Sequence, residues 1–129
     1  MVFRLGRHGI LIRSAAVEQS IRNNSLKGDT PMIIEQKRDE NALTIAPEGY
    51  LDTTTAPELK AVLDTALAGV KELTFDFEKL EYISSSGLRL LLFAQKAMDR
   101  QGSMKVVNAN ETVKEIFEVT GFSDFLTIE

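Results

Sequence analysis

The residue types best suited to chemistry are three adjacent serines, Ser84, Ser85 and Ser86, followed by Gly87. They open a leucine-rich segment within EYISSSGLRLLLFAQKAMDR, residues 81–100, which is typical of a helix. One serine oxygen at the start of a helix accepts a hydrogen bond from an early backbone N–H and stabilises the helix by about 1 kcal/mol. Capping does not need three hydroxyls, so the other interpretations are a nucleophile, a phosphate-binding loop and a modification site.

The first two of these interpretations fit the surrounding residues poorly. A nucleophile elbow has the pattern G-x-S-x-G, but Ile83 stands where the first glycine should be. The only histidine, His8, lies near the N-terminus, so neither a Ser-His-Asp triad nor a histidine metal cluster is expected. A lysine base would be the remaining route to a serine hydrolase. The G-x-x-x-x-G-K pattern of a P-loop is absent.

A modification site fits the serines better. A helix N-terminus carries unpaired N–H groups and the positive end of the helix dipole, so it tolerates a phosphate. Phosphorylation adds about −1.5 to −2 charge at neutral pH. Such a charge need not unfold the domain, but it changes which partner can dock on that surface.

The helix after the serines has a basic side and an apolar side. The basic side carries three cations on an otherwise acidic domain: Arg89, Lys96 and Arg100. The opposite side is predicted to face the core and carries Leu90, Leu91, Ala94, Ala97 and Met98. Three more apolar residues flank the basic strip and are either simply buried or part of a binding surface: Leu88, Leu92 and Phe93.

The composition is that of an ordinary globular domain. The chain has 129 residues, with 43% hydrophobic and 26% charged residues. It contains no cysteine, which excludes disulfides and cysteine-ligated metals and fits the reducing cytoplasm. The net charge of −4 divides into +3 over residues 1–31 and −7 over the rest. An acidic domain is a poor partner for nucleic acid, and no apolar run approaches the roughly 18 residues that span a membrane.

Residues 1–31 are basic and rich in serine, asparagine, glycine and arginine, unlike the rest of the chain. They lack the apolar region and cleavage site of a signal peptide. We expect an N-terminal extension, either disordered or translated from a wrongly assigned upstream start, and a domain over residues 32–129. KGDTPM back-translates to a purine-rich ribosome-binding sequence ahead of ATG, which predicts a native start at Met32. An intact endogenous peptide spanning residues 27–33 would contradict that start.

From Met32 onward the periodicity predicts strands alternating with helices. Two strands within residues 32–51 surround a turn at 38–41, and a helix follows over 52–69. A strand within 70–80, a helix to about Arg100 and a strand over 103–108 come next. The last helix, over 108–121, is predicted to be capped by Asn108 and ended by Gly121, and the apolar tail is expected to pack. This order predicts an α/β fold, a small mixed, largely parallel sheet with helices mainly on one face.

Three separated motifs carry a resemblance to a known family. EGYLDTTTAPEL, then LEYISSSGLRLLL about thirty residues later, then VVNANETVKEIFEVTGF together resemble the STAS domains of bacterial anti-sigma factor antagonists, over residues 32–129. The resemblance implies a cytoplasmic switch protein that is not an enzyme and has no cofactor. It implies neither nucleic acid nor membrane as a partner. The alternative is a STAS scaffolding or regulatory subunit of a signalling or transport complex.

The resemblance also implies a partner-switching cycle. The unphosphorylated protein would bind an anti-sigma factor with serine kinase activity and so release a sigma factor. Phosphorylation of a serine would end that complex, and a metal-dependent serine phosphatase would restore it.

The resemblance assigns roles to individual residues. Ser85 aligns with the phosphorylated serine, Ser84 and Ser86 are less favoured acceptors, and Ser84 stands where many members have aspartate. Asp52 belongs to a G-x-L-D element near the expected kinase-binding surface, and it can also cap the next helix. No residue is expected to be catalytic or to bind a metal. The predicted partner-binding residues are Asp52, Ser84, Ser85, Ser86, Gly87, Arg89, Leu92, Phe93 and Lys96.

Overall fold

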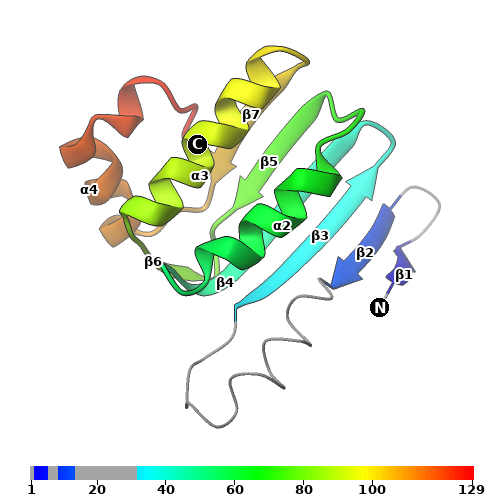
Figure 1. Ribbon diagram of the computed structural model, residues 1–129, viewed down its shortest axis with the longest axis horizontal. Helices are drawn as coiled ribbons and strands as arrows, with labels where there is room; N and C mark the ends of the chain where they lie inside the picture. The colour runs from blue at the N-terminus through cyan, green and yellow to red at the C-terminus, as the bar shows by residue number, and fades with distance from the viewer. Residues whose placement is uncertain (1, 6–8, 14–31) are drawn as a thin grey trace, which may run out of the picture.

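The computed structural model describes residues 2–5, 9–13 and 32–129, and Figure 1 shows a twisted sheet with helices packed on one face. The strands are β1 (Val2–Leu5), β2 (Gly9–Arg13), β3 (Ile33–Asp39), β4 (Ala42–Leu51), β5 (Glu72–Asp76), β6 (Leu80–Ile83) and β7 (Ser103–Val107). The helices are α2 (Ala56–Ala66), α3 (Ser85–Asp99), α4 (Glu111–Thr120) and the short 3-10 helix η1 (Phe122–Asp124). From β3 onward the predicted order is confirmed, with β6 added.

The sheet joins antiparallel and parallel strand pairs. Its order is β1-β2-β3-β4-β5-β7, and β6 pairs with β4 off this path. The pairs from β1 to β4 are antiparallel, whereas β4–β5, β5–β7 and β4–β6 are parallel. Parallel neighbours need crossover connections, which α2 and α3 supply. The predicted α/β fold with a mixed, largely parallel sheet over residues 32–129 is confirmed.

The core lies between the sheet and the helices. Strands β3, β4, β5 and β7 send alternate residues into it, as in β5, where Leu73 and Phe75 are buried and Glu72 is exposed. The buried residues of α2 and α3 recur at helical spacing and cover this face of the sheet. Phe77 and Phe117 bring further rings into the core, and both are fully buried.

Two details differ from the sequence predictions. β6 was not predicted because only Leu80 and Ile83 of its residues are buried, which leaves no alternation to detect. The predicted cap Asn108 is wrong: Asn110 is the N-cap of α4, and its Oδ1 accepts a backbone N–H of the first turn at 2.8 Å. Asn108 instead has a positive φ of 61° and donates from Nδ2 to Asp76 at 3.1 Å. Which of the two asparagines caps α4 therefore depends on the backbone conformation just after β7.

The C-terminal tail packs as predicted. Leu126 is buried, and Phe122 and Ile128 lie partly buried against the core. Ile128 also forms an isolated parallel bridge with Val106 of β7. Gly121 ends α4 as predicted, with a φ of 82° in the left-handed region that favours glycine. The tail thus closes the β7 edge of the sheet.

The expected N-terminal extension contributes two strands to the sheet. β2 pairs antiparallel with β3, from Ile10 beside Arg38 to Arg13 beside Glu35, and β1 pairs with β2. The remainder of the extension, residues 1, 6–8 and 14–31, lies outside the described residues. A native start at Met32 and a domain limited to residues 32–129 stay predictions.

Candidate functional site

The three serines lie where β6 ends and α3 begins. Ser84 is the N-cap of α3: its backbone is extended, with a ψ of 179°, and its Oγ accepts a hydrogen bond from the N–H of Ser86 at 3.2 Å. The N–H of Ser84 donates to the carbonyl of Leu51 at 2.8 Å, which fastens the turn to the end of β4. The predicted capping role is therefore confirmed for one serine, Ser84.

The other two hydroxyls differ in their surroundings. Ser86 is half-buried, and its Oγ lies 3.2 Å from Oγ1 of Thr53 in the turn before α2. Ser85 is exposed, and within the described part of the chain its Oγ has no hydrogen-bond partner. Ser85 is thus the serine whose hydroxyl is free to meet another molecule.

Gly87 packs beneath the serine turn. It is buried in the first turn of α3, where an added Cβ would lie 2.6 Å from Cγ1 of Ile83 and 2.8 Å from Cγ of Leu51. Both distances are far below van der Waals contact, so glycine lets α3 approach the ends of β4 and β6 this closely. The expectation that Gly87 itself contacts a partner does not fit this buried position.

Replacing Gly87 by alanine is expected to destabilise the fold by about 1–3 kcal/mol, because the added methyl group must displace Ile83 or Leu51. Chemical denaturation followed by circular dichroism would measure the change. Ser85→Ala, an exposed change in the same helical turn, is the control and should alter the free energy of unfolding by less than about 0.5 kcal/mol. A Gly87→Ala variant as stable as the wild type would contradict the packing of this turn.

Asp52 closes the neighbouring turn, between β4 and α2. Its Oδ1 accepts the backbone N–H groups of Thr54 and Thr55 at 2.9 and 3.1 Å. The prediction that Asp52 also caps α2 is wrong, because the N-cap of α2 is Thr55, three residues later. Thr53 of this turn meets Ser86, which places the two turns side by side.

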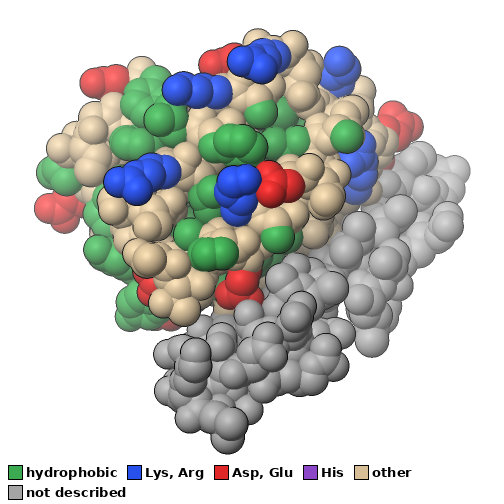
Figure 2. All heavy atoms as spheres, viewed as in Figure 1, with side chains coloured by type: hydrophobic (Ala, Val, Ile, Leu, Met, Phe, Trp, Pro, Cys, Tyr) green, Lys and Arg blue, Asp and Glu red, His purple; other side chains and the backbone are tan. Residues whose placement is uncertain are grey.

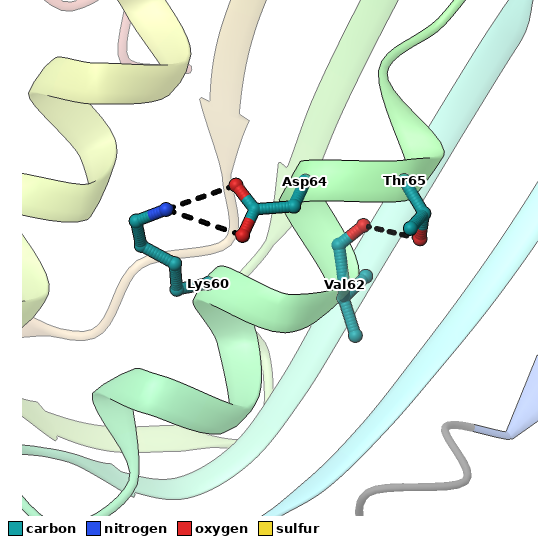
Figure 3. Close-up of polar contacts among 4 residues, drawn as sticks. All are labelled: Lys60, Val62, Asp64 and Thr65. Carbon is teal, nitrogen blue, oxygen red and sulfur yellow. Dashed lines mark hydrogen bonds and ion pairs between the residues drawn. The ribbon is translucent and has the colours of Figure 1, made fainter.

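A groove of about 420 Å³ lies between α2 and α3, next to the serine turn. Its lining combines small and apolar side chains with three charged groups: Thr53, Ala56, Pro57, Lys60, Ala61, Asp64, Ser86, Arg89 and Leu90. Nζ of Lys60 binds both carboxylate oxygens of Asp64, at 2.9 and 3.2 Å, as Figure 3 shows. The same Nζ lies 5.0 Å from the ring centroid of Phe93 on α3. Two of the three charges in the groove are therefore paired with each other.

The outward face of α3 carries four of the nine predicted binding residues. Arg89, Phe93 and Lys96 are exposed and Leu92 is half-buried, and Phe93 leaves 41% of its surface open. Figure 2 shows basic side chains spaced along α3 on this face of the molecule. Leu88 is buried, so the structure assigns it to the core. Leu92 and Phe93 are not fully buried, and their part in a binding surface stays a prediction.

Two features beside the predicted residues were missed by sequence reasoning. The first is the groove, whose walls come from segments that are far apart in sequence. The second is an aromatic pair: Tyr50 of β4 and Tyr82 of β6 are exposed at 56% and 40%, with ring centroids 6.1 Å apart. Each tyrosine lies within a motif already singled out, but only the parallel pairing of β4 with β6 brings the two rings together.

Among the residues that the structure describes, no group of three or more His, Cys, Asp or Glu side chains is placed to hold a metal ion. In those same ranges, none of the helices combines the length and the apolar character needed to cross a membrane.

Comparison with known proteins shows which protein family this chain resembles in sequence. Residues 33–129 match the family described as the STAS domain. The chain is 31% identical over 98 residues to the anti-sigma-B factor antagonist of Listeria monocytogenes, an alignment that covers 73% of this chain and 84% of that protein.

Solved structures show the same fold. The anti-sigma factor antagonist SpoIIAA in its unphosphorylated form is similar with a TM-score of 0.66 and 22% identity, over 74% of this chain and 87% of that one. The Bacillus cell fate determinant SpoIIAA in the phosphorylated form has a TM-score of 0.60 and 21% identity, over 74% of this chain and 90% of that one. The sequence matches and the shared fold show that this chain belongs to the STAS domain family.

Proposed function

We propose that this protein is an anti-sigma factor antagonist that works as a phosphorylation switch. Its unphosphorylated form binds an anti-sigma factor that is also a serine kinase, and this binding releases a sigma factor. Phosphorylation of Ser85 ends the complex, and a metal-dependent serine phosphatase restores the binding form. The observation that supports this most directly is the exposed hydroxyl of Ser85 at the first position of α3, without a hydrogen-bond partner in the described chain.

The geometry favours Ser85 over its two neighbours as the acceptor. Phosphoryl transfer needs the acceptor oxygen in line with the γ-phosphorus of ATP, so that oxygen must be reachable. Ser84 Oγ is engaged in capping α3, and Ser86 Oγ faces Thr53. On transfer, an Oγ–P bond replaces the Oγ–H bond of Ser85, ADP leaves, and the hydroxyl proton passes to a base on the kinase.

The proposed binding surface joins the turn at Asp52, the serine turn and the outward face of α3. A partner that covers this face covers Ser85 as well, because the serine begins the same helix. Phe93 offers exposed aromatic area, which is common at binding hot spots. Arg89 and Lys96 favour a partner with acidic groups opposite them.

A phosphate on Ser85 changes this surface and leaves the core intact. It adds about −1.5 to −2 charge at a helix N-terminus, where anions are favoured, and the exposed serine has no packing to lose. Inside an interface the same charge must be desolvated and repels acidic groups of the partner. The proposed switch therefore acts on binding and not on folding.

The direct test is incubation with the cognate anti-sigma kinase and ATP, followed by mapping of the phosphorylated residue by mass spectrometry. We expect one phosphate on the wild type, at Ser85, and none on Ser85→Ala. Ser86→Ala is the matched control, because it removes the adjacent hydroxyl and should still be phosphorylated at Ser85. Phosphate on Ser86 of the wild type, or none on any serine, would defeat the proposal.

The proposal places the protein in the cytoplasm and requires no catalytic activity, cofactor, nucleic acid or membrane. Genomic neighbours distinguish it from the scaffolding alternative. Genes for an anti-sigma kinase and a sigma factor next to this one would support the switch, whereas a transport operon would support a regulatory subunit.

A further inference from the structure

We propose that Arg89 captures the phosphate on Ser85 within the same molecule. The proposal rests on the modification of Ser85 proposed above and concerns what the modified side chain contacts. Ser85 is the first residue of α3, and Arg89 lies four residues along the same helix. Residues i and i+4 of an α-helix are neighbours on one face, with about 5–6 Å between their Cβ atoms. The long arginine side chain therefore reaches a phosphoserine there without any change of backbone.

Arg89 is free to make this contact. It is exposed, and in the described part of the molecule it takes part in no hydrogen bond or ion pair. The first turn of α3 holds no acidic residue that would compete for it. A guanidinium binds a phosphate through two parallel charge-assisted hydrogen bonds, which are stronger than bonds between neutral groups.

Three other charged groups, Lys60, Asp52 and Lys96, are either engaged elsewhere or distant from Ser85. Lys60 of α2 lines the same groove as Arg89 but is held by Asp64 at 2.9 Å. The Asp52 carboxylate accepts two backbone N–H groups of its own turn. Lys96 lies eleven residues beyond the serine, about 16 Å along the helix axis. Arg89 is therefore the cation that a phosphate on the first residue of α3 meets.

Pairing of Arg89 with the phosphate changes the charge of the proposed binding surface in two ways. The phosphate adds negative charge at Ser85, and the pairing withdraws the positive charge of Arg89 from the α2–α3 groove. A partner carboxylate that binds Arg89 in the unphosphorylated protein then loses that contact and faces the phosphate. Arg89 acts as a positioning residue that couples modification of the serine to the charge of the groove.

The test is a ³¹P NMR titration of the full chain with phosphoserine installed at position 85 by amber suppression during synthesis. A neighbouring guanidinium stabilises the phosphate dianion and lowers its second pKa, which is about 6 in a free phosphoserine. Arg89→Gln is expected to raise this pKa by about half a unit at low salt, and Arg89→Lys to raise it less. Added salt should shrink the difference.

Arg100→Gln is the matched control. It removes the same charge from the other end of the helix, just past the last residue of α3, and should leave the phosphate pKa within about 0.1 unit of the parent protein. Equal pKa values for the parent and Arg89→Gln would overturn the proposal. An equal rise of the phosphate pKa in Arg89→Gln and Arg100→Gln would also overturn the proposal. Such a result would indicate an effect of the overall charge of the protein and not a specific pair of Arg89 with the phosphate.

This experiment is independent of the proposed function. The phosphoserine is installed without a kinase, and the titration needs no partner protein. A cognate kinase that modifies a different serine would defeat the proposed function and leave the titration result unchanged.

Discussion

The Ser85→Ala variant should bind the cognate anti-sigma kinase with the same affinity whether or not ATP is present, whereas the wild type should lose affinity as it becomes phosphorylated. We expect phosphorylated wild type to bind about 100-fold more weakly, or roughly 2.7 kcal/mol, because a desolvated dianion repels acidic partner groups. Ser85→Asp brings one negative charge in place of nearly two, so it should bind weakly, between the two forms.

Titration calorimetry with the purified kinase would measure these affinities, with a non-hydrolysable ATP analogue for the unphosphorylated state. Ser85→Asn is the matched control for Ser85→Asp, because it has nearly the same shape and no charge, and it should bind like the wild type. Equal partner affinity for wild type, Ser85→Ala and phosphorylated protein would show that the serine is no switch.

The Phe77→Ala variant should lose about 3–5 kcal/mol of its free energy of unfolding, because the removed ring leaves a cavity. Phe77 is fully buried just after β5, with its ring centroid 5.8 Å from that of Phe75 and 6.5 Å from that of Phe117 in α4. A domain is typically stable by about 5–15 kcal/mol in total. Thermal denaturation should therefore show a transition shifted to much lower temperature.

Phe93→Ala makes the same chemical change on the surface of α3. Because Phe93 is 41% exposed and its ring centroid lies 5.0 Å from Nζ of Lys60, this variant should lose less than about 1 kcal/mol of stability. It should weaken partner binding instead, since it removes exposed aromatic area from the proposed interface. These two predictions would be contradicted if Phe93→Ala were as destabilised as Phe77→Ala, or if Phe93→Ala bound the partner like the wild type.

Much of the fold was predictable because short-range patterns dictate it. Leu73 and Phe75 alternate with polar residues and form β5, and Gly121 ends α4 where its spacing predicts an end. Ser84 caps α3 for the same reason, since a cap depends on a residue type and on the N–H groups two or three positions away. These features need no knowledge of the rest of the chain.

The two features that the sequence did not predict correctly, β6 and the cap of α4, depend instead on the rest of the chain. β6 consists of residues with no alternation and exists because the end of β4 offers it a parallel partner. Asn110, and not Asn108, caps α4: Nδ2 of Asn110 donates to the carbonyl of Leu80 at 3.1 Å, whereas Asn108 has a positive φ and donates to Asp76. Each outcome depends on a contact with a segment far away in sequence, which local propensity does not contain.

The sequence by itself determined the alternating strands and helices of residues 32–129, the run of three serines at a helix start, and the motifs that predict the family. The family resemblance already singled out Ser85 as the acceptor, but only the tertiary structure showed how the surroundings of the three hydroxyls differ, because those surroundings come from other segments. The carbonyl of Leu51 holds Ser84 and Thr53 faces Ser86, which leaves Ser85 exposed. The packing of β4 and β6 against Gly87 sets that arrangement, since a side chain at Gly87 would clash with both strands and move the turn.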